Sequence, residues 1–334
     1  MTLVRVMKNT GVASMAQQSR PMNHEFSRRS LLMKAYKNIF LSVMLFAMMT
    51  GMAAAEVLMP FVLASKTSGG DVQQIAGEVK GKLTGAGFEV VGEYSPYNGA
   101  SVIVVTNDEL KTNAGKSEHG GFGAAQRVGI TKNGDDVEVI FTNPVYMAAA
   151  YRMEGDLAGV RSALDSALGS MQDFGSEKDL TAKDLRKYHY TVMMEYFDDP
   201  SELAEYDSYE AGVAAVEAGL AAGKGGAAKV YRIDVPGKKE TLFGVALKGT
   251  NAEDCSGDEY IMSRIDKATP RSTAHLPYEI LVTDDEAIAL YARFRIAINW
   301  PHLPMMKSDT GATFMSIMCS PAAIEEALEE VAGG

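Results

Sequence analysis

The sequence has few of the residues and motifs that identify an enzyme or a cofactor protein. Its 334 residues include two cysteines and one tryptophan, with no C-x-x-C, H-E-x-x-H, G-x-S-x-G or P-loop motif. Because C-x-x-C-H is also absent, covalently attached haem is excluded. The best-marked zinc-protease, hydrolase and nucleotide sites are missing as well. Catalytic residues stay unknown from the sequence, since only the fold assembles a convergent triad.

Basic charge is scarce outside the N-terminal segment. Residues 56–334 hold 25 Lys and Arg side chains against 42 Asp and Glu side chains. The resulting net charge of −17 repels phosphate backbones, which argues against a nucleic-acid partner. Hydrophobic residues make up 46% of the chain, so we expect a packed core rather than disorder.

One apolar run, residues 39–52, is shorter than the roughly 20 residues that a membrane-spanning helix needs. It follows two lysines and ends in three small residues at Ala55, which is the order of a secretory signal. We expect a leader over residues 1–55, cleavage near Ala55 and a periplasmic mature protein without a membrane span. A retained anchor is the alternative, and the Arg28-Arg29 pair leaves twin-arginine export open.

Two stretches of the chain carry the same hairpin pattern. Residues 125–144 have Asn-Gly at a turn between two apolar runs, the favoured chemistry of a tight hairpin. Residues 274–301 read as two long strands around an Asp-Asp turn. Every second residue from Ile288 to Ile298 is apolar there, which predicts that the second strand extends to Ile298.

The elements predicted around these hairpins follow one order twice. Residues 56–175 and residues 207–334 each read α-β-β-α-β-β-α, with residues 176–206 as a helical linker between them. The sequence therefore predicts an α/β (α+β) protein of two similar modules related by internal duplication.

A few residues at the hairpins follow the pattern of a known family. They are Leu276-Pro277 at the start of the second hairpin, Asn143-Pro144 at the end of the first, and Arg127. In these residues the chain resembles the bacterial family called domain of unknown function 302. Where that family often has Cys-Arg after Leu-Pro, this chain has Tyr278-Glu279. The resemblance implies an α/β fold and no established activity. It also implies a pseudo-dimeric tandem that replaces the family's homodimer, with a pseudo-two-fold axis.

Soft-metal ligands gather after the second hairpin. They are His302, Met305, Met306, Met315, Met318 and Cys319. Thioether and thiolate ligands select Cu(I), and imidazole also suits copper. The alternative is a buried segment in which methionine fills gaps. Cys319 has a second interpretation as well, a disulfide with Cys255, which an oxidising compartment permits.

Other candidate ligand-binding residues are histidines and arginines. His189 lies between two tyrosines and near methionines, a composition suited to a flat ligand such as haem or a quinone, or to plain packing. Arg293 and Arg295 are predicted to share one strand face, where they bind an anion or pair with Glu279. His119 and His275 each precede a hairpin, so a shared site between the modules is a further hypothesis.

These features predict a non-catalytic protein that binds a small ligand or a metal between its two modules. Copper or a flat organic ligand fits the side chains, and neither is required by them. One alternative is a redox or respiratory accessory enzyme with a histidine-containing cleft between the modules. Another is a structural protein that presents its acidic surface to a partner in the cell envelope.

Overall fold

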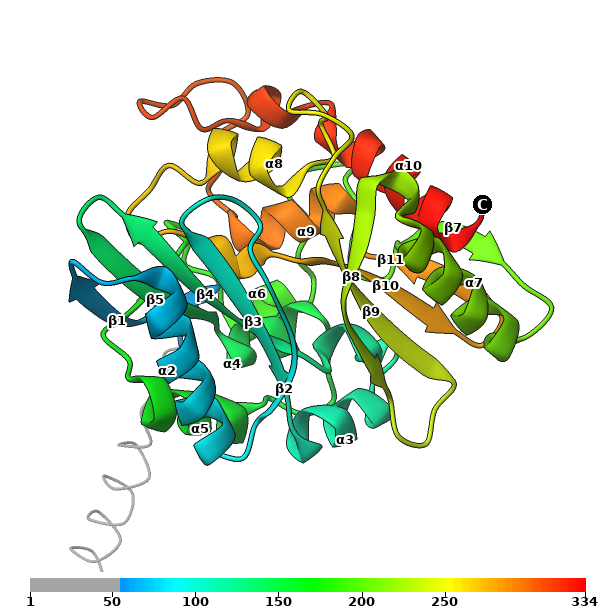
Figure 1. Cartoon of the computed structure of the whole chain (residues 1–334), viewed down its shortest axis with the longest axis horizontal. Coiled ribbons are helices and arrows are strands. Elements are labelled where there is room, and N and C mark those ends of the chain that lie inside the picture. The colour runs from blue at the N-terminus through cyan, green and yellow to red at the C-terminus, as the bar shows by residue number, and fades with distance from the viewer. Residues whose placement is uncertain (1–54) are drawn as a thin grey trace, which may run out of the picture. The chain divides into compact units, whose positions relative to one another are not determined.

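The computed structural model describes residues 55–334, so the predicted leader and its cleavage site lie outside the described residues. Residues 55–334 form one unit of mixed helices and two antiparallel sheets (Figure 1). No helix in this part of the chain is both long and apolar enough to cross a membrane.

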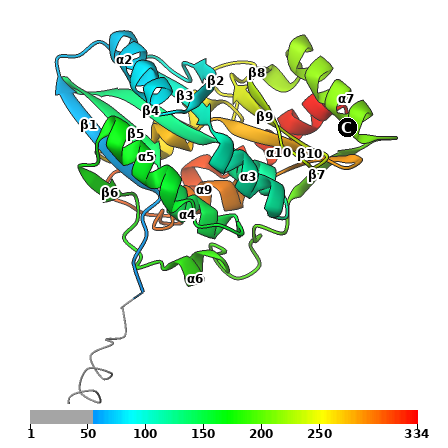
Figure 2. The same ribbon diagram turned by 90° about the horizontal axis from the view of Figure 1, so that it is seen from below.

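The first half of the unit is built on a six-stranded sheet in the order β2-β3-β4-β5-β1-β6. Its strands are β1 (Phe61–Ser68), β2 (Glu89–Tyr94), β3 (Ala100–Thr106), β4 (Gln126–Asn133), β5 (Asp136–Thr142) and β6 (Gln172–Phe174). Its helices are α2 (Val72–Gly85), α3 (Asp108–Lys116), the 3₁₀ helix η1 (Gly120–Gly123), α4 (Pro144–Ala150) and α5 (Ala158–Leu168). Helices α2 and α5 pack on each other beside this sheet (Figure 2).

The second half is built on a five-stranded sheet in the order β7-β11-β10-β9-β8. Its strands are β7 (Ser201–Glu205), β8 (Ala227–Asp234), β9 (Glu240–Leu247), β10 (Tyr278–Thr283) and β11 (Glu286–Ala289). Its helices are α7 (Tyr209–Ala222), η2 (Lys224–Gly226), α8 (Asp258–Ile265), η3 (Thr273–His275), α9 (Ala292–Asn299), η4 (Phe314–Ile317) and α10 (Ser320–Ala332). The single-turn helix α6 (Ala182–Leu185) lies between the halves in sequence.

Local signals explain where several elements begin and turn. The side chains of Asp71 and Ser208 accept backbone N–H groups and so cap α2 and α7. Asn143 caps α4, with Pro144 at the first helical position. Gly134 has φ +64° in the β4–β5 turn, the conformation that glycine adopts without strain.

The two halves share their strand order and a local irregularity. Strands β2-β3-β4-β5-β1 correspond in order to β8-β9-β10-β11-β7. A β-bulge interrupts the β2–β3 pair between Val90 and Gly92, and another interrupts the β8–β9 pair between Lys229 and Tyr231. Helix α5 packs on α2 and β1, and α10 packs on α7 and β7. Each half therefore contains the same core of strands and helices.

The structure corrects the element order that we predicted. Each half begins with a strand, β1 or β7, that the sequence analysis missed. Strand β1 is buried in its first half and exposed in its second, so it has no period-two pattern. Strand β7 is only five residues long, and it falls inside the predicted helical linker, residues 176–206. Much of that linker is irregular, with one helical turn in α6.

The prediction of a strand up to Ile298 is wrong. Strand β11 ends at Ala289, and the following residues form helix α9. All residues of α9 except Arg293 are buried, so the helix shows no polar face to reveal a 3.6-residue period. The short apolar run therefore resembles a strand in sequence.

The two halves interlock through reciprocal contacts. Helix η1 of the first half packs on β9 and β10, while η3 of the second half packs on β3, β4 and β5. Edge strands β2 and β8 lie side by side (Figure 1). A Cβ atom at Gly92 would lie 2.5 Å from the carbonyl oxygen of Val230, and one at Gly121 would lie 2.4 Å from a methyl group of Leu281. Glycine is therefore needed where the halves approach most closely.

Candidate functional site

A cleft of about 800 Å³ lies where both halves contribute surface. The first half supplies residues 172–177, at and after β6. The second half supplies residues 265–272 before η3 and residues 300–312 after α9. The outer edge of the first sheet thus forms one side of the cleft, and two loops of the second half line it as well. Its volume lies in the range usual for small-molecule sites.

Phe174 of the first half and Trp300 of the second half line the cleft, and fully buried rings pack behind them. Trp300 follows α9, is 5% exposed, and meets the Phe61 ring edge-on at a centroid distance of 6.5 Å. Phe61 in turn contacts the Phe174 ring at 5.7 Å. Behind Trp300, the buried His275 ring packs edge-on at 4.7 Å. Packed rings of this kind offer a rigid apolar surface to a planar or apolar ligand group.

His302 supplies a polar group on the same lining. Its imidazole is half-buried, and burial lowers its pKa below the usual value of 6.5. Its Nδ1 atom is buried and has no hydrogen-bond partner within residues 55–334. The Gly175 backbone, which also lines the cleft, acts on this pKa in the opposite direction, and the covered Nδ1 atom is not open to a ligand in the cleft.

The charged side chains around the cleft differ in whether they already have an ion-pair partner. Asp173 is held by Arg161, whose guanidinium donates to both of its carboxylate oxygens at 2.7 and 2.9 Å. Lys267 and Lys307 are exposed, as are the lining carboxylates of Glu177 and Asp309, and none of the four makes an ion pair with any described residue. The cleft therefore offers two free ammonium groups and two free carboxylates, and an anionic group of a ligand would bind at the lysines.

A buried ionic cluster joins the two sheets away from this cleft. Arg127 on β4 donates to Glu279 on β10 at 2.8 Å, and both side chains are 2% exposed. The Tyr231 hydroxyl donates to the same Glu279 oxygen at 2.8 Å. The Arg295 Nε atom lies 3.5 Å from the other carboxylate oxygen. One carboxylate thus faces two guanidinium groups inside the protein, so the cluster keeps an excess positive charge.

The cluster also fixes the surroundings of His275. Arg295 donates to the His275 carbonyl oxygen at 2.6 Å and to the Pro277 carbonyl oxygen at 3.1 Å. Burial, followed by the charges of Arg295 and Arg127, lowers the pKa of His275 well below its usual value. The His275 ring is therefore neutral at neutral pH.

The predicted common strand face of Arg293 and Arg295 does not exist, because both residues lie on helix α9. Arg295 points into the buried cluster with Glu279. Arg293 is partly exposed, pairs with Glu195 and lies over the Tyr291 ring at 4.8 Å. The two arginines thus belong to different environments, and no common anion site forms between them.

The other predicted histidines are dispersed. The His189 ring packs at a tilt against Tyr196 with a centroid distance of 4.5 Å, and its Nδ1 atom lies 2.8 Å from the Thr191 carbonyl oxygen. His119 packs near Phe197 and lines a separate surface hollow of about 290 Å³. His275 is fully buried beside Trp300. No hydrogen bond or ring contact joins His119 to His275 within residues 55–334.

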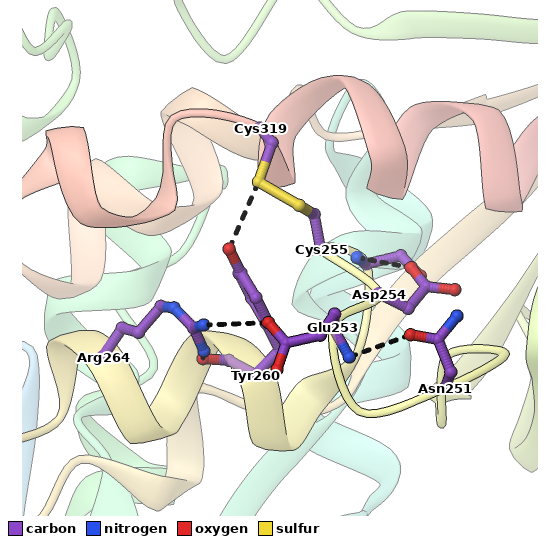
Figure 3. The surroundings of a disulfide bond; sticks show 8 residues. Asn251, Glu253, Asp254, Cys255, Tyr260, Arg264 and Cys319 are labelled. Carbon is purple, nitrogen blue, oxygen red and sulfur yellow. Dashed lines mark hydrogen bonds and ion pairs between the residues drawn. A yellow bond between two sulfur atoms is a disulfide. The ribbon is translucent and has the colours of Figure 1, made fainter.

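The two cysteines are joined to each other. Cys255 and Cys319 form a disulfide with a Cα–Cα distance of 5.8 Å (Figure 3). The Tyr260 hydroxyl lies 3.4 Å from the Cys319 sulfur, and the Arg264 guanidinium lies 3.4 Å from the centre of the Tyr260 ring. Cys319 therefore has no free thiolate for a metal. In the described part of the chain, no three His, Cys, Asp or Glu side chains are placed to hold a metal ion.

Two buried carboxyl groups escaped the sequence analysis. Asp258 accepts a hydrogen bond at 3.0 Å from Tyr94 of the other half, and burial raises its pKa to about 8. Asp266, next to the cleft residue Lys267, accepts the Ser272 backbone N–H at 2.9 Å, and burial raises its pKa to about 7. Each aspartate looks like an ordinary surface residue in the sequence, so no local pattern marks its burial.

No family model, curated protein or solved structure matched the chain. Arguments about function therefore rest on the geometry described above.

Proposed function

We propose that the protein binds a small organic anion in the cleft between its two halves. The observation that carries this proposal is one lining with three features. It has an aromatic wall drawn from both halves, a partly exposed imidazole at His302, and two exposed lysines without an ion pair. A planar or apolar body would lie on the wall, and its carboxylate would meet Lys267 and Lys307.

The single tryptophan of the chain makes this proposal directly testable. Because Trp300 lines the cleft, a set of small aromatic and aliphatic carboxylates can be screened by its emission. We expect at least one acid to give a saturable change. We expect the double variant Lys267→Gln/Lys307→Gln to bind that acid at least tenfold more weakly, as loss of two charge-assisted contacts implies.

A matched control separates this effect from a general change in charge. Lys187→Gln removes an exposed lysine outside the cleft lining and is expected to keep wild-type affinity. Unchanged affinity in the Lys267→Gln/Lys307→Gln variant, or equal loss in the control, would contradict an anion site at this place.

We also propose that the two halves arose by duplication and that the tandem stands in place of a homodimer. The equal strand orders, the matched bulges and the reciprocal packing support this. Arg127 pairs with Val104, the β3 residue at the bulge, and Glu279 pairs with Gly244, the corresponding β9 residue. These equivalent positions meet at 2.8 Å, where a symmetric dimer would place two like side chains.

Two further parts of this proposal concern origin and location. The hairpin residues favour a relation to domain of unknown function 302. The disulfide favours an oxidising compartment such as the periplasm, because such bonds are rare in the cytosol. N-terminal sequencing of the protein from a periplasmic fraction tests the location, with a mature N-terminus near residue 56 as the expected result.

A further inference from the structure

Four methionine side chains are exposed on one surface segment of the second half. We call them the thioether patch: Met305 (46% exposed), Met306 (70%), Met315 (49%) and Met318 (68%). Nine large hydrophobic side chains are exposed within residues 55–334, and six of these are methionines. The thioether patch holds four of the six methionines. The patch therefore does not fill gaps in the core.

The backbone brings the members of the patch together. The Met315 N–H donates to the Met305 carbonyl oxygen at 3.0 Å, which places these two residues side by side. Met315 lies in the 3₁₀ helix η4, and Met318 follows directly, with its N–H directed at the Met315 carbonyl oxygen at 3.4 Å. Side chains three residues apart eclipse each other in a 3₁₀ helix, so these two thioethers lie on the same side.

Within residues 303–318, the buried apolar side chains differ in type from the exposed ones. Leu303, Phe314 and Ile317 are buried and carry the packing, while the four methionines point to solvent. Exposed apolar groups gain no burial energy, so packing does not explain them. A protein-docking surface would be expected to carry aromatic anchors, and the only aromatic residue of this segment, Phe314, is buried.

We propose that the thioether patch binds a soft monovalent cation, Cu(I) or Ag(I). Thioether sulfur is a soft, neutral ligand that selects Cu(I) over hard divalent ions. The structure narrows the ligand set that the sequence indicated, because Cys319 is bound in the disulfide and the His302 ring lines the cleft. The cation site thus lies on the surface of the second half, beside the cleft but outside its lining.

Silver titration of the full mature protein tests this without a reductant, so the disulfide stays intact. We expect one Ag(I) per chain in chloride-free buffer, with shifts of the Met305, Met315 and Met318 methyl resonances. The variant Met315→Leu/Met318→Leu keeps size and apolarity and is expected to lose at least tenfold in affinity. Met171→Leu/Met193→Leu, which removes two exposed methionines elsewhere, is the matched control and is expected to bind as wild type.

A change of pH separates thioether from imidazole ligands. Thioethers do not titrate, so binding at pH 5.5 is expected to equal binding at pH 7.5, whereas imidazole ligands lose metal as they protonate. Absence of saturable Ag(I) binding would overturn the proposal. So would equal loss in the Met171→Leu/Met193→Leu control, or loss on His302→Gln with the thioether patch intact.

Discussion

The strands and helices found in both halves differ in role from the longer connections of the second half. These shared strands and helices build the junction, where η1 packs on the second sheet and η3 packs on the first. The connection between β3 and α3 is Asn107 alone, whereas residues 248–257 connect β9 to α8. Helices α4 and α5 are joined by residues 151–157, and α9 and α10 by residues 300–319.

The longer connections of the second half carry the candidate sites. Residues 300–319 hold Trp300, His302, Lys307 and the thioether patch, and the cleft is completed by residues 266–272 and by the first half's β6 region. The disulfide joins the two longer connections, because Cys255 lies in residues 248–257 and Cys319 ends residues 300–319. The buried ionic cluster thus lies on strands present in both halves and on α9, whereas much of the cleft lining and the thioether patch lie on the longer connections of the second half.

The largest effect is expected in the common core. Glu279→Gln leaves the guanidinium groups of Arg127 and Arg295 buried without a counter-charge, and should cost about 3–5 kcal/mol of unfolding free energy, measured by urea denaturation. Arg293→Gln is the matched control. It removes the partly exposed ion pair that Arg293, on the same helix α9 as Arg295, makes with Glu195, and should cost at most about 1 kcal/mol.

The same experiment sharpens the comparison of the halves. The swap Arg127→Glu/Glu279→Arg keeps one pair of opposite charges but places a guanidinium at position 279 beside Arg295, so it should recover little of the loss seen in Glu279→Gln. A Glu279→Gln variant as stable as Arg293→Gln would refute the view that this pair holds the junction.

The next largest effect is expected between the two longer connections. Cys255→Ala/Cys319→Ala opens a connection between residues 64 positions apart and should lower the unfolding free energy by about 2–4 kcal/mol. Differential scanning calorimetry of the variant, with oxidised and reduced wild type as references, measures the loss. Since residues 300–319 line the cleft, ligand binding followed by Trp300 emission should weaken as well. An unaffected melting temperature would show that the loops hold their places without the bond.

A smaller, pH-dependent effect is expected at Asp258. In the unfolded chain its carboxyl ionises near its usual pKa of 3.8, whereas the folded state keeps the proton up to a pKa of about 8. Between these values the unfolded state binds fewer protons, so stability falls as the pH rises. Asp266 acts in the same direction up to about pH 7. The lowered pKa of His275 acts oppositely, but only below about pH 6.5.

Asp258→Asn isolates this contribution. Between pH 6.5 and 8.5, wild type should lose about 2 kcal/mol more stability than the variant, since each pKa unit corresponds to about 1.4 kcal/mol. Thermal denaturation at both pH values measures the difference. Parallel pH profiles of the two proteins would mean that the Asp258 carboxyl ionises in the folded state as it does in the unfolded one.

Several local features were predictable from the sequence. The turn at Asn133-Gly134 lies where the Asn-Gly dipeptide indicates it, and Asp284 has φ +48° in the second hairpin turn. Helix α10 begins at Ser320 with Pro321 in its first turn, as proline there predicts, although Cys319 and not Ser320 holds the N-cap position. The error at α9 shows the limit of such patterns, since a helix buried on nearly all sides has no polar stripe and its short apolar run suits a strand equally well.

The sequence by itself determined the mixed α/β class, the hairpin turns and the scarcity of catalytic signatures, because turn chemistry and residue periodicity act over a few neighbouring residues. Only the tertiary structure decided that Arg127 meets Glu279, that Asp258 is buried against Tyr94, and that Trp300, His302 and β6 enclose one cleft. Those contacts join residues more than one hundred positions apart, and burial at such contacts depends on how the sheets pack, which no local pattern encodes.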